Sequence, residues 1–287
     1  MAFNEAANIG SLLKALLEQR LEKVRVAEIV VVASGCTDDT GKITLAFRER
    51  DPRVKLLTQP TREGKASALN FLLNNTSQEI IVMESADTVP EPEAIEHLVR
   101  PFADPQVGMT GGRPVPINDP RRFMGFTAHL LWQLHHQLSL RNPKMGELIA
   151  FRRCFRQIPY DSAVDEVSIE LLVLGQGLKL RYVPEAIVYN KGPETVGDFL
   201  KQRRRIFAGH LRVKNTLGYK ASTMNGLYIL WLLLRNMRLD WRYFLWGPAV
   251  VFLEVLGRSL GVYDCIVRKR NHFVWPVAGS TKEPLDL

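Results

Sequence analysis

The stretch over residues 79–90 constrains the fold most, because an apolar run ends there in a cluster of acids and hydroxyls. Residues 80–83 are apolar without alternation, which is typical of a strand buried on both faces. Glu84, Ser85 and Asp87 follow, and two prolines then precede an apolar pattern with helical spacing. Open α/β sheets hold ligands at such strand ends. A solvated turn would explain a lone acid, but several other predicted strands end in similar polar clusters.

The rest of the first two hundred residues alternates between helical and strand patterns, which favours an α/β fold. Predicted strands cover residues 28–33, 54–57, 107–112 and 180–183, and residues 146–153 form a strand or loop. Predicted helices cover residues 9–17, 40–47, 66–70, 94–99, 123–138 and 195–213. Asn8 and the hydroxyl-rich turn at 34–40 are expected to cap the helices that follow them.

The bulk properties indicate a globular protein with an anionic partner. The net charge is +8 and the pI is near 9.5, which suits nucleic acid, a phosphorylated substrate or an acidic membrane. No repeat or RNA-binding aromatic motif singles out nucleic acid, so we expect no nucleic-acid partner. Three cysteines without CxxC spacing support neither a disulfide framework nor a zinc site, and they indicate a reducing compartment.

Two pairs of adjacent residues at predicted helix starts, Gly64-Lys65 and Asp165-Glu166, include candidate site residues. Gly64 permits close approach of a ligand, and Lys65 supplies a charge at a helix amino end, which favours anions. A Gly-Lys pair is more often only a turn. Asp165 and Glu166 open a later helix, where simple capping by the helix dipole also accounts for acids.

Two helices carry further candidates. Gln202 and Arg205 are three residues apart and share one face of a helix, although runs of arginine are often only a solvated basic face. His129, His135 and His136 have no acidic neighbour at ligand spacing on their helix. We interpret these three histidines as surface or packing residues rather than metal ligands.

Five segments in register make the chain resemble a family 2 glycosyltransferase of the GT-A fold, over roughly two thirds of its length. They resemble, in order, the nucleotide loop, the Gly-Lys loop, the Asp-x-Asp metal motif, the base motif and the Gln-x-x-Arg-Trp motif of that family. The segments are FNEAANI at 3–9, REGKASALN at 62–70, SADTVP at 85–90, VDE at 164–166 and QRRRI at 202–206.

The resemblance implies a mixed α/β sheet flanked by helices, a nucleotide-sugar donor (UDP- or GDP-sugar) and a divalent cation, Mn2+ or Mg2+. It makes Glu166 the general base with Asp165 beside it, and Asp87 the metal ligand. The implied donor-binding residues are Glu5, Ser34, Arg62, Lys65, Ser85, Asp87, Gln202 and Arg205. The implied reaction is transfer of a sugar with inversion to a lipid-linked or glycan acceptor.

The chain departs from the family pattern at positions that bear on the nucleotide and the metal. Ala33 and Ser34 replace two aspartates that usually contact the nucleotide base, and Ser85 replaces the first metal-motif aspartate. The base motif has its two acids interchanged, and Ile206 replaces the final tryptophan. Glu84 is a candidate substitute for the missing acid, although alternation along the strand aims it away from Ser85.

The last third of the chain has a different composition, which suggests a catalytic domain over residues 1–215 and an apolar, basic helical segment over 216–287. Runs 226–234 and 243–257 are apolar, but each is shorter than the roughly 20 residues of a spanning helix. Arginines and lysines surround the runs, at positions 235, 238, 242, 258 and 268–270. We expect a peripheral or monotopic attachment to the anionic, cytoplasmic face of a membrane, with packing against the catalytic domain or another subunit as the alternative.

Two other functions remain open from the sequence. A nucleotidyltransferase also uses paired acids on a Rossmann-like sheet, but its Gly-rich loop normally lies near the amino terminus. A relative that binds nucleotide sugars without catalysis is the third alternative, because Ala33, Ser34 and Ser85 have lost family residues. Family members also begin with a buried central strand before the FNEAANI loop. We therefore expect about ten further residues upstream, the length of a typical strand with a short lead.

Overall fold

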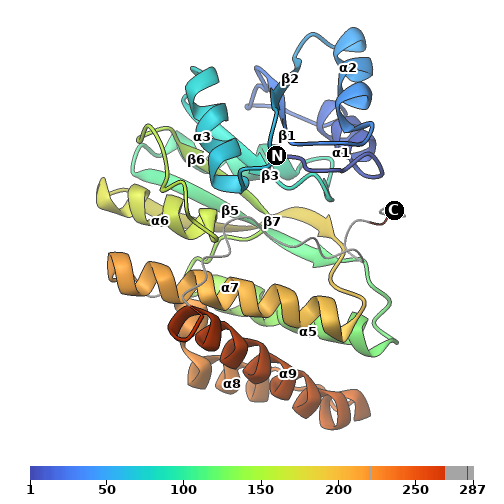
Figure 1. Cartoon of the computed structure of the whole chain (residues 1–287), viewed down its shortest axis with the longest axis vertical. Coiled ribbons are helices and arrows are strands. Elements are labelled where there is room, and N and C mark those ends of the chain that lie inside the picture. Colours follow the sequence, from blue (N-terminus) through green and yellow to red (C-terminus); the bar gives the residue numbers. More distant parts are fainter. Residues whose placement is uncertain (220, 269–282, 284–287) are drawn as a thin grey trace.

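The computed structural model describes residues 1–219, 221–268 and 283, and it shows a mixed sheet with helices packed around it (Figure 1). The strands are β1 (Ile29–Ser34), β2 (Val54–Gln59), β3 (Ile80–Glu84), β4 (Thr88–Pro90), β5 (Val107–Pro116), β6 (Leu148–Arg152) and β7 (Lys179–Asn190). The helices are α1 (Ile9–Leu17), α2 (Thr40–Arg50), α3 (Lys65–Asn75), α4 (Ala94–Val99), α5 (Phe123–Ser139), α6 (Asp165–Gly175), α7 (Val196–Leu217), α8 (Gly226–Arg235) and α9 (Trp241–Ile266). Short 3-10 helices cover Arg100–Ala103 and Ser222–Met224.

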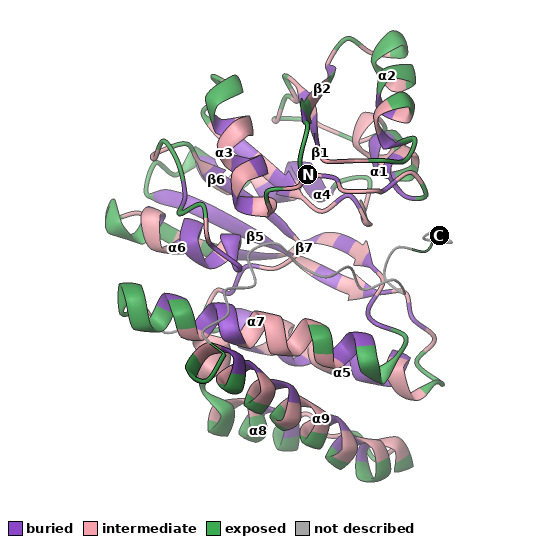
Figure 2. Ribbon diagram, viewed as in Figure 1, coloured by how far each residue is buried: buried purple, intermediate pink, exposed green. Residues whose placement is uncertain are grey.

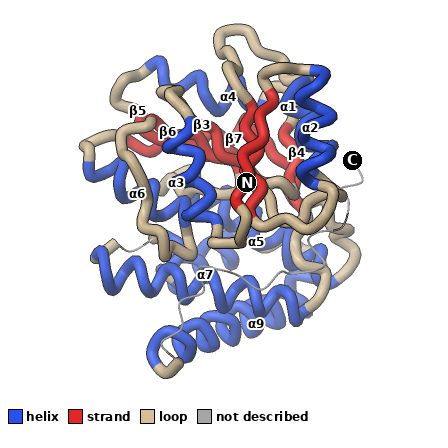
Figure 3. The backbone as a smooth tube through the Cα atoms, turned by 45° about the horizontal axis from the view of Figure 1, so that its top comes forward, coloured by secondary structure: helices blue, strands red, loops and turns tan. Residues whose placement is uncertain are grey.

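The larger sheet has five strands in the order β3-β6-β5-β7-β4. Strand β6 is antiparallel to β3 and β5, β5 is parallel to β7, and β4 is antiparallel to β7. Strands β1 and β2 form a separate parallel pair. Ala2 bridges to Ala33 of β1, and the Met1 amino group lies 3.5 Å from the Glu84 carbonyl oxygen. The first two residues therefore link the two sheets, and the amino terminus lies among the strands (Figure 3).

Strand β6 shows why the sheet is buried on both faces. Ile149 and Phe151 pack into a core with α3 and α6, whereas Leu148 and Ala150 pack into a second core with α4. All four side chains are fully buried, as the alternation of a strand between two helical layers requires. Figure 2 shows the central strands of the sheet coloured mostly as buried. The polar residue that precedes this strand, Glu147, is thereby fixed at the edge of the sheet next to the end of β3.

Strands β5 and β7 are longer than the strands predicted at 107–112 and 180–183, and both continue past prolines. Pro184 lies where the β5–β7 register shifts, between the pairs Gly111–Tyr182 and Arg113–Ile187. Pro114 and Pro116 lie in the half of β5 that pairs with β7 and not with β6. Proline is tolerated at bulges and on the unpaired side of a strand, because no ladder hydrogen bond is lost there.

The predicted helix caps are only partly right. Asn8 stands at the N-cap position of α1, but its side chain makes no capping hydrogen bond there. The turn at 34–40 does contact the start of α2, but through the Asp38 carboxylate rather than a hydroxyl. This carboxylate accepts the backbone N–H groups of Thr40 at 3.1 Å and Ala6 at 2.9 Å. The turn is thereby tied to the amino-terminal loop that enters the site.

Helices α8 and α9 form an outer layer beneath α5 and α7 (Figure 1). Helix α9 approaches α7 closely at Gly257, which has no side chain. A Cβ added at Gly257 would lie only 2.7 Å from the Arg203 Cβ. Arg204 of α7 pairs with the buried carboxylate of Asp264 on α9. Within residues 1–219 and 221–268, no helix is both long and apolar enough to cross a bilayer. Lys269 and Arg270, two of the basic residues expected to flank the apolar runs, lie outside the described residues.

Candidate active site

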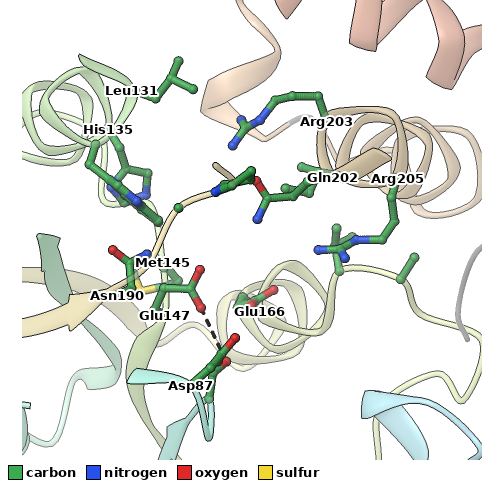
Figure 4. Close-up of a pocket in the computed structure, with 18 of the residues that line it drawn as sticks. Asp87, Leu131, His135, Met145, Glu147, Glu166, Asn190, Gln202, Arg203 and Arg205 are labelled. Carbon is green, nitrogen blue, oxygen red and sulfur yellow. Dashed lines mark hydrogen bonds between the residues drawn. The ribbon is translucent and has the colours of Figure 1, made fainter. Parts of the chain in front are cut away.

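A cavity of about 440 Å³ opens where the polar strand ends meet α5, α6 and α7 (Figure 4). It gathers nine of the ten site residues predicted from the sequence. They are Glu5, Ser34, Arg62, Lys65, Ser85, Asp87, Glu166, Gln202 and Arg205. Asp165 is the exception: it is buried directly behind the wall, with 1% of its surface exposed.

Several of these side chains reach the cavity because they lie where a strand ends or a helix begins. Ser34 ends β1, Lys65 begins α3, and Asp87 lies in the turn between β3 and β4. Gln202 and Arg205 project from one face of α7, as their spacing predicts. The parallel and antiparallel strand ends therefore bring acids to one wall, and α7 brings cations to the opposite wall (Figure 4).

Lys65 holds the two acids at the start of α6. Its Nζ lies 3.2 Å from Asp165 Oδ2 and 3.4 Å from Glu166 Oε1. Burial alone would lower the pKa of Lys65, but the charges of Asp165, Glu166 and Glu147 together outweigh burial and raise it. Burial and the charge of Glu166 raise the pKa of Asp165. Burial would also raise the pKa of Glu166, but the charges of Lys65 and Lys144 outweigh burial and lower it, which keeps this cavity-facing carboxylate ionised.

Glu147 is a cavity residue that the sequence analysis missed. The Ser85 hydroxyl donates to Glu147 Oε2 at 3.4 Å, across the antiparallel pairing of β3 with β6. Burial, with the negative charge of Asp87, raises the pKa of Glu147 to about 7. The position that lacks the first metal-motif aspartate is thus bonded to a carboxylate from the neighbouring strand.

Glu84 does not take that place. Its Oε1 accepts a hydrogen bond from the Thr88 hydroxyl at 3.0 Å, and burial raises the pKa of Glu84 to about 8. Glu84 is absent from the described residues that line the cavity. Strand alternation correctly predicts that it faces away from Ser85.

The amino-terminal loop, the end of β1 and the loop after β2 also line the cavity. The Arg62 guanidinium lies 4.1 Å from the centre of the Phe3 ring, a cation–π contact that joins two predicted donor loops. Gly35 has φ of +64°, and a Cβ there would lie 2.5 Å from the Arg62 backbone nitrogen. Glycine is therefore needed for the turn after β1 to pack against the Arg62 loop.

The oxygen donors beside Ser85 fit a divalent cation that is shared with a diphosphate. Asp87 and Glu147 are close enough for the charge of Asp87 to raise the pKa of Glu147, and a bound cation would relieve this repulsion. Among the described residues, no group of three or more acids, histidines or cysteines forms a closed metal cage. Mg2+ sites typically use only one or two carboxylates and complete their coordination with water and substrate phosphates.

The three histidines of α5 have different surroundings. The His129 ring Nε2 lies 2.8 Å from the Asn118 carbonyl, and the His136 Nδ1 lies 2.8 Å from the Tyr182 hydroxyl. His135 instead lines the cavity. The interpretation as packing residues therefore suits His129 and His136 better than His135.

Comparison with known proteins agrees with this geometry. The family model described as "Glycosyl transferase family 2" matches residues 1–163. Poly-beta-1,6-N-acetyl-D-glucosamine synthase of Staphylococcus aureus is 25% identical over 216 residues, which cover 71% of this chain and 51% of that protein. The chain thus spans about half the length of the curated relatives it matches.

Two solved structures share the fold. A mannosyltransferase from Pyrobaculum calidifontis, solved with GDP-Man and Mn2+, has a TM-score of 0.61 at 22% identity, covering 92% of this chain and 73% of that one. Glucosyl-3-phosphoglycerate synthase from Mycobacterium tuberculosis, solved with Mn2+, uridine-diphosphate and glucosyl-3-phosphoglycerate, has a TM-score of 0.51 at 21% identity, covering 77% and 79%. The chain therefore belongs to glycosyl transferase family 2, and it has the GT-A fold.

Proposed function

We propose that this protein transfers a sugar with inversion from a UDP- or GDP-sugar to a lipid-linked or glycan acceptor. The observation that carries the proposal is the convergence of Asp87, Glu166, Gln202 and Arg205 on one cavity. Acids on the sheet side and cations on α7 match a reaction in which an acceptor loses a proton while a diphosphate leaves with negative charge. Family membership favours this chemistry over the nucleotidyltransferase alternative.

Glu166 acts as the general base in this proposal. Its carboxylate faces the cavity, and its lowered pKa keeps it ready to accept the proton of an acceptor hydroxyl. The acceptor oxygen then forms a bond to the anomeric carbon as the bond from that carbon to the diphosphate oxygen breaks on the opposite side. Asp165 is buried, so it orients Lys65 and supports the start of α6 instead of touching substrate.

The donor lies between the amino-terminal loops and α7. Glu5, Ser34 and Arg62 face the nucleoside, and Lys65, Gln202 and Arg205 face the diphosphate. Asp87 and Glu147, with the Ser85 hydroxyl, would hold Mn2+ or Mg2+, which when bound neutralises charge on the leaving diphosphate. The neighbours solved with Mn2+ and nucleotides support a cation in this role.

The surface of α8 and α9 supports attachment to an anionic membrane, at its cytoplasmic face, without a spanning helix. Leu227 on α8, Leu239 in the loop between α8 and α9, and Phe252 on α9 expose 82%, 100% and 65% of their surface. The exposed Trp231 ring makes cation–π contacts with the guanidinium groups of Arg141 and Arg235. Apolar side chains flanked by arginines suit the boundary between acyl chains and anionic head groups. The other face of α8 and α9 packs on α5 and α7. Membrane attachment is therefore proposed only for the face that this packing leaves exposed.

The direct test is nucleoside diphosphate release from a panel of UDP- and GDP-sugars with Mn2+, with and without acceptor glycans. Turnover that depends on Glu166 supports the transferase. Release of pyrophosphate from a nucleoside triphosphate and a sugar phosphate would instead show a nucleotidyltransferase. Tight donor binding without turnover in the presence of every acceptor tested would show that the protein binds nucleotide sugars without catalysis.

A further inference from the structure

We infer that the part of the cavity between α5, α7 and α9 is a binding subsite for the hydroxyl groups of an uncharged saccharide, the acceptor of the reaction. The inference rests on the proposed function. It concerns polar atoms that the donor and the cation do not use. His135 of α5, Arg203 and His210 of α7, and Glu254 of α9 all line this part of the cavity.

Several polar atoms here are buried and lack hydrogen bonds. Within the described residues, neither ring nitrogen of His135 has a partner with hydrogen-bond geometry, although the Met145 backbone is close. The same holds for His210 Nδ1, in a residue with 7% of its surface exposed. An unsatisfied buried polar group costs about 1–3 kcal/mol, so these atoms favour a bound ligand or water that bonds to them.

Arg203 and Glu254 place a donor and an acceptor side by side, so that one hydroxyl beside them can bond to both. Arg203 Nε and Glu254 Oε2 lie 3.7 Å apart, and among the described residues neither atom has a hydrogen-bond partner. One donates and the other accepts. A hydroxyl can accept from Nε–H and donate to the carboxylate at once, whereas a phosphate oxygen could only accept. A neutral imidazole likewise offers one donor and one acceptor.

The charges favour a neutral ligand. Burial lowers the pKa of both His135 and His210 to about 3, with Lys144 adding to the effect, so both rings are neutral at physiological pH. The cations already have carboxylate partners, because Arg203 and Arg258 share Glu254 and Lys144 pairs with Glu170 at 3.2 Å.

The position suits the acceptor. His135 and Arg203 point into the same space, with the Glu147 and Glu166 carboxylates between them and Asp87 (Figure 4). The charge of Glu166 also acts on His210. Trp132 lines the same wall and meets His135 edge to face at 5.1 Å, which adds an apolar surface for a sugar ring. An acceptor held here has its hydroxyl beside the base and on the side of the cavity away from the amino-terminal loops.

The test is saturation-transfer NMR on the full chain loaded with UDP or GDP and Mn2+. The probes are methyl glycosides of glucose, mannose and N-acetylglucosamine, their disaccharides, and inorganic phosphate. We expect at least one saccharide to bind and His135→Leu to weaken it about fivefold or more, which corresponds to about 1 kcal/mol for a lost hydrogen bond. His136→Leu on the same helix is the matched control, because that ring bonds to Tyr182 outside the cavity.

Arg203→Met provides a second variant if His135→Leu does not fold, and it should weaken the same saccharide. Nucleotide binding in each sample separates the two proposals. Absent nucleotide binding contradicts the proposed function. If nucleotide binds, three results overturn the subsite. They are no saccharide signal, a signal equal in wild type and in His135→Leu or Arg203→Met, and displacement of every saccharide by phosphate.

Discussion

The Ser85 hydroxyl and the Glu147 carboxylate lie 3.4 Å apart although their residues are 62 positions apart in the chain. Ser85 follows β3 and Glu147 precedes β6, and the antiparallel register that pairs Glu84 with Leu148 sets the two side chains opposite each other. An acid that the local motif lacks is thus supplied from the adjacent strand. Asp87 completes the group from the turn after β3.

Glu147→Gln is therefore expected to weaken Mn2+-dependent binding of UDP or GDP. The Mn2+-dependent affinity should fall at least about 10- to 100-fold, because removing a residue that supports a metal ligand typically costs that much. Asp87→Ala should abolish the metal-dependent part of binding. Isothermal titration with and without Mn2+ measures both effects.

Glu84→Gln is the matched control, because Glu84 is partly buried beside the same strand end but does not line the cavity. Equal Mn2+-dependent affinity in Glu147→Gln and wild type would remove Glu147 from the metal site. Loss of binding in Glu84→Gln would mean that the fold of the strand end, rather than a ligand, is being measured.

Glu166→Gln is expected to bind the donor and to lose transfer by about 100- to 10,000-fold, since a positioned general base contributes that much. Single-turnover transfer and titration with nucleoside diphosphate measure the two properties. Asp165→Asn should instead lower the melting temperature, because it removes one partner of the buried pair with Lys65. An active Glu166→Gln with a folded but inactive Asp165→Asn would reverse the assignment of the two acids.

Membrane attachment through α8 and α9 predicts binding to vesicles that contain anionic lipid, weakening with salt. Leu239→Glu should reduce the partition coefficient about tenfold or more, because removing a leucine from an apolar phase costs about 1.5–3 kcal/mol. Leu45→Glu on α2 is the control, since α2 lies at the opposite end of the molecule (Figure 1). No flotation of wild type at low salt, or equal flotation of Leu239→Glu, would contradict the proposal.

Residues that sit in local motifs do come together in the structure. Lys65, Asp87, Glu166, Gln202 and Arg205 stand at a strand end, at a helix start or at an i,i+3 spacing, the family resemblance marks them as candidates, and all five line the cavity. The strands predicted at 107–112 and 180–183 were too short, because β5 and β7 continue past prolines that tertiary pairing places at a bulge and on an unpaired side.

Residues outside those motifs could not be predicted. Glu147 enters the site only through the pairing of β3 with β6, which one sequence does not reveal. His135 and His136 are neighbours on α5, but only the packing of α5 against the sheet decides which one faces the cavity. The signal that was available for Glu147 was its place directly before an apolar strand, at the edge where the other acids gather.

The last prediction concerns acid sensitivity and follows from His210. Burial, with the charge of Lys144, lowers the pKa of His210 to about 3, below the roughly 6.5 of an unfolded chain. Between these values the unfolded chain binds a proton that the folded protein excludes, so the free energy of unfolding falls as the pH falls. Below pH 6.5 one such histidine contributes a loss of about 1.4 kcal/mol per pH unit.

Replacing this residue isolates its share. His210→Asn should unfold in urea with about 1.4 kcal/mol less loss of stability than wild type between pH 7.5 and 5.5, whatever its stability at neutral pH. Glu84 and Glu147, whose pKa values are raised to about 8 and about 7, act in the opposite direction. They contribute equally to both proteins, so the difference between the two curves reports on His210 alone. Parallel curves for wild type and His210→Asn would show that His210 takes up a proton in the folded protein and that its surroundings are wetter than the buried cavity wall implies.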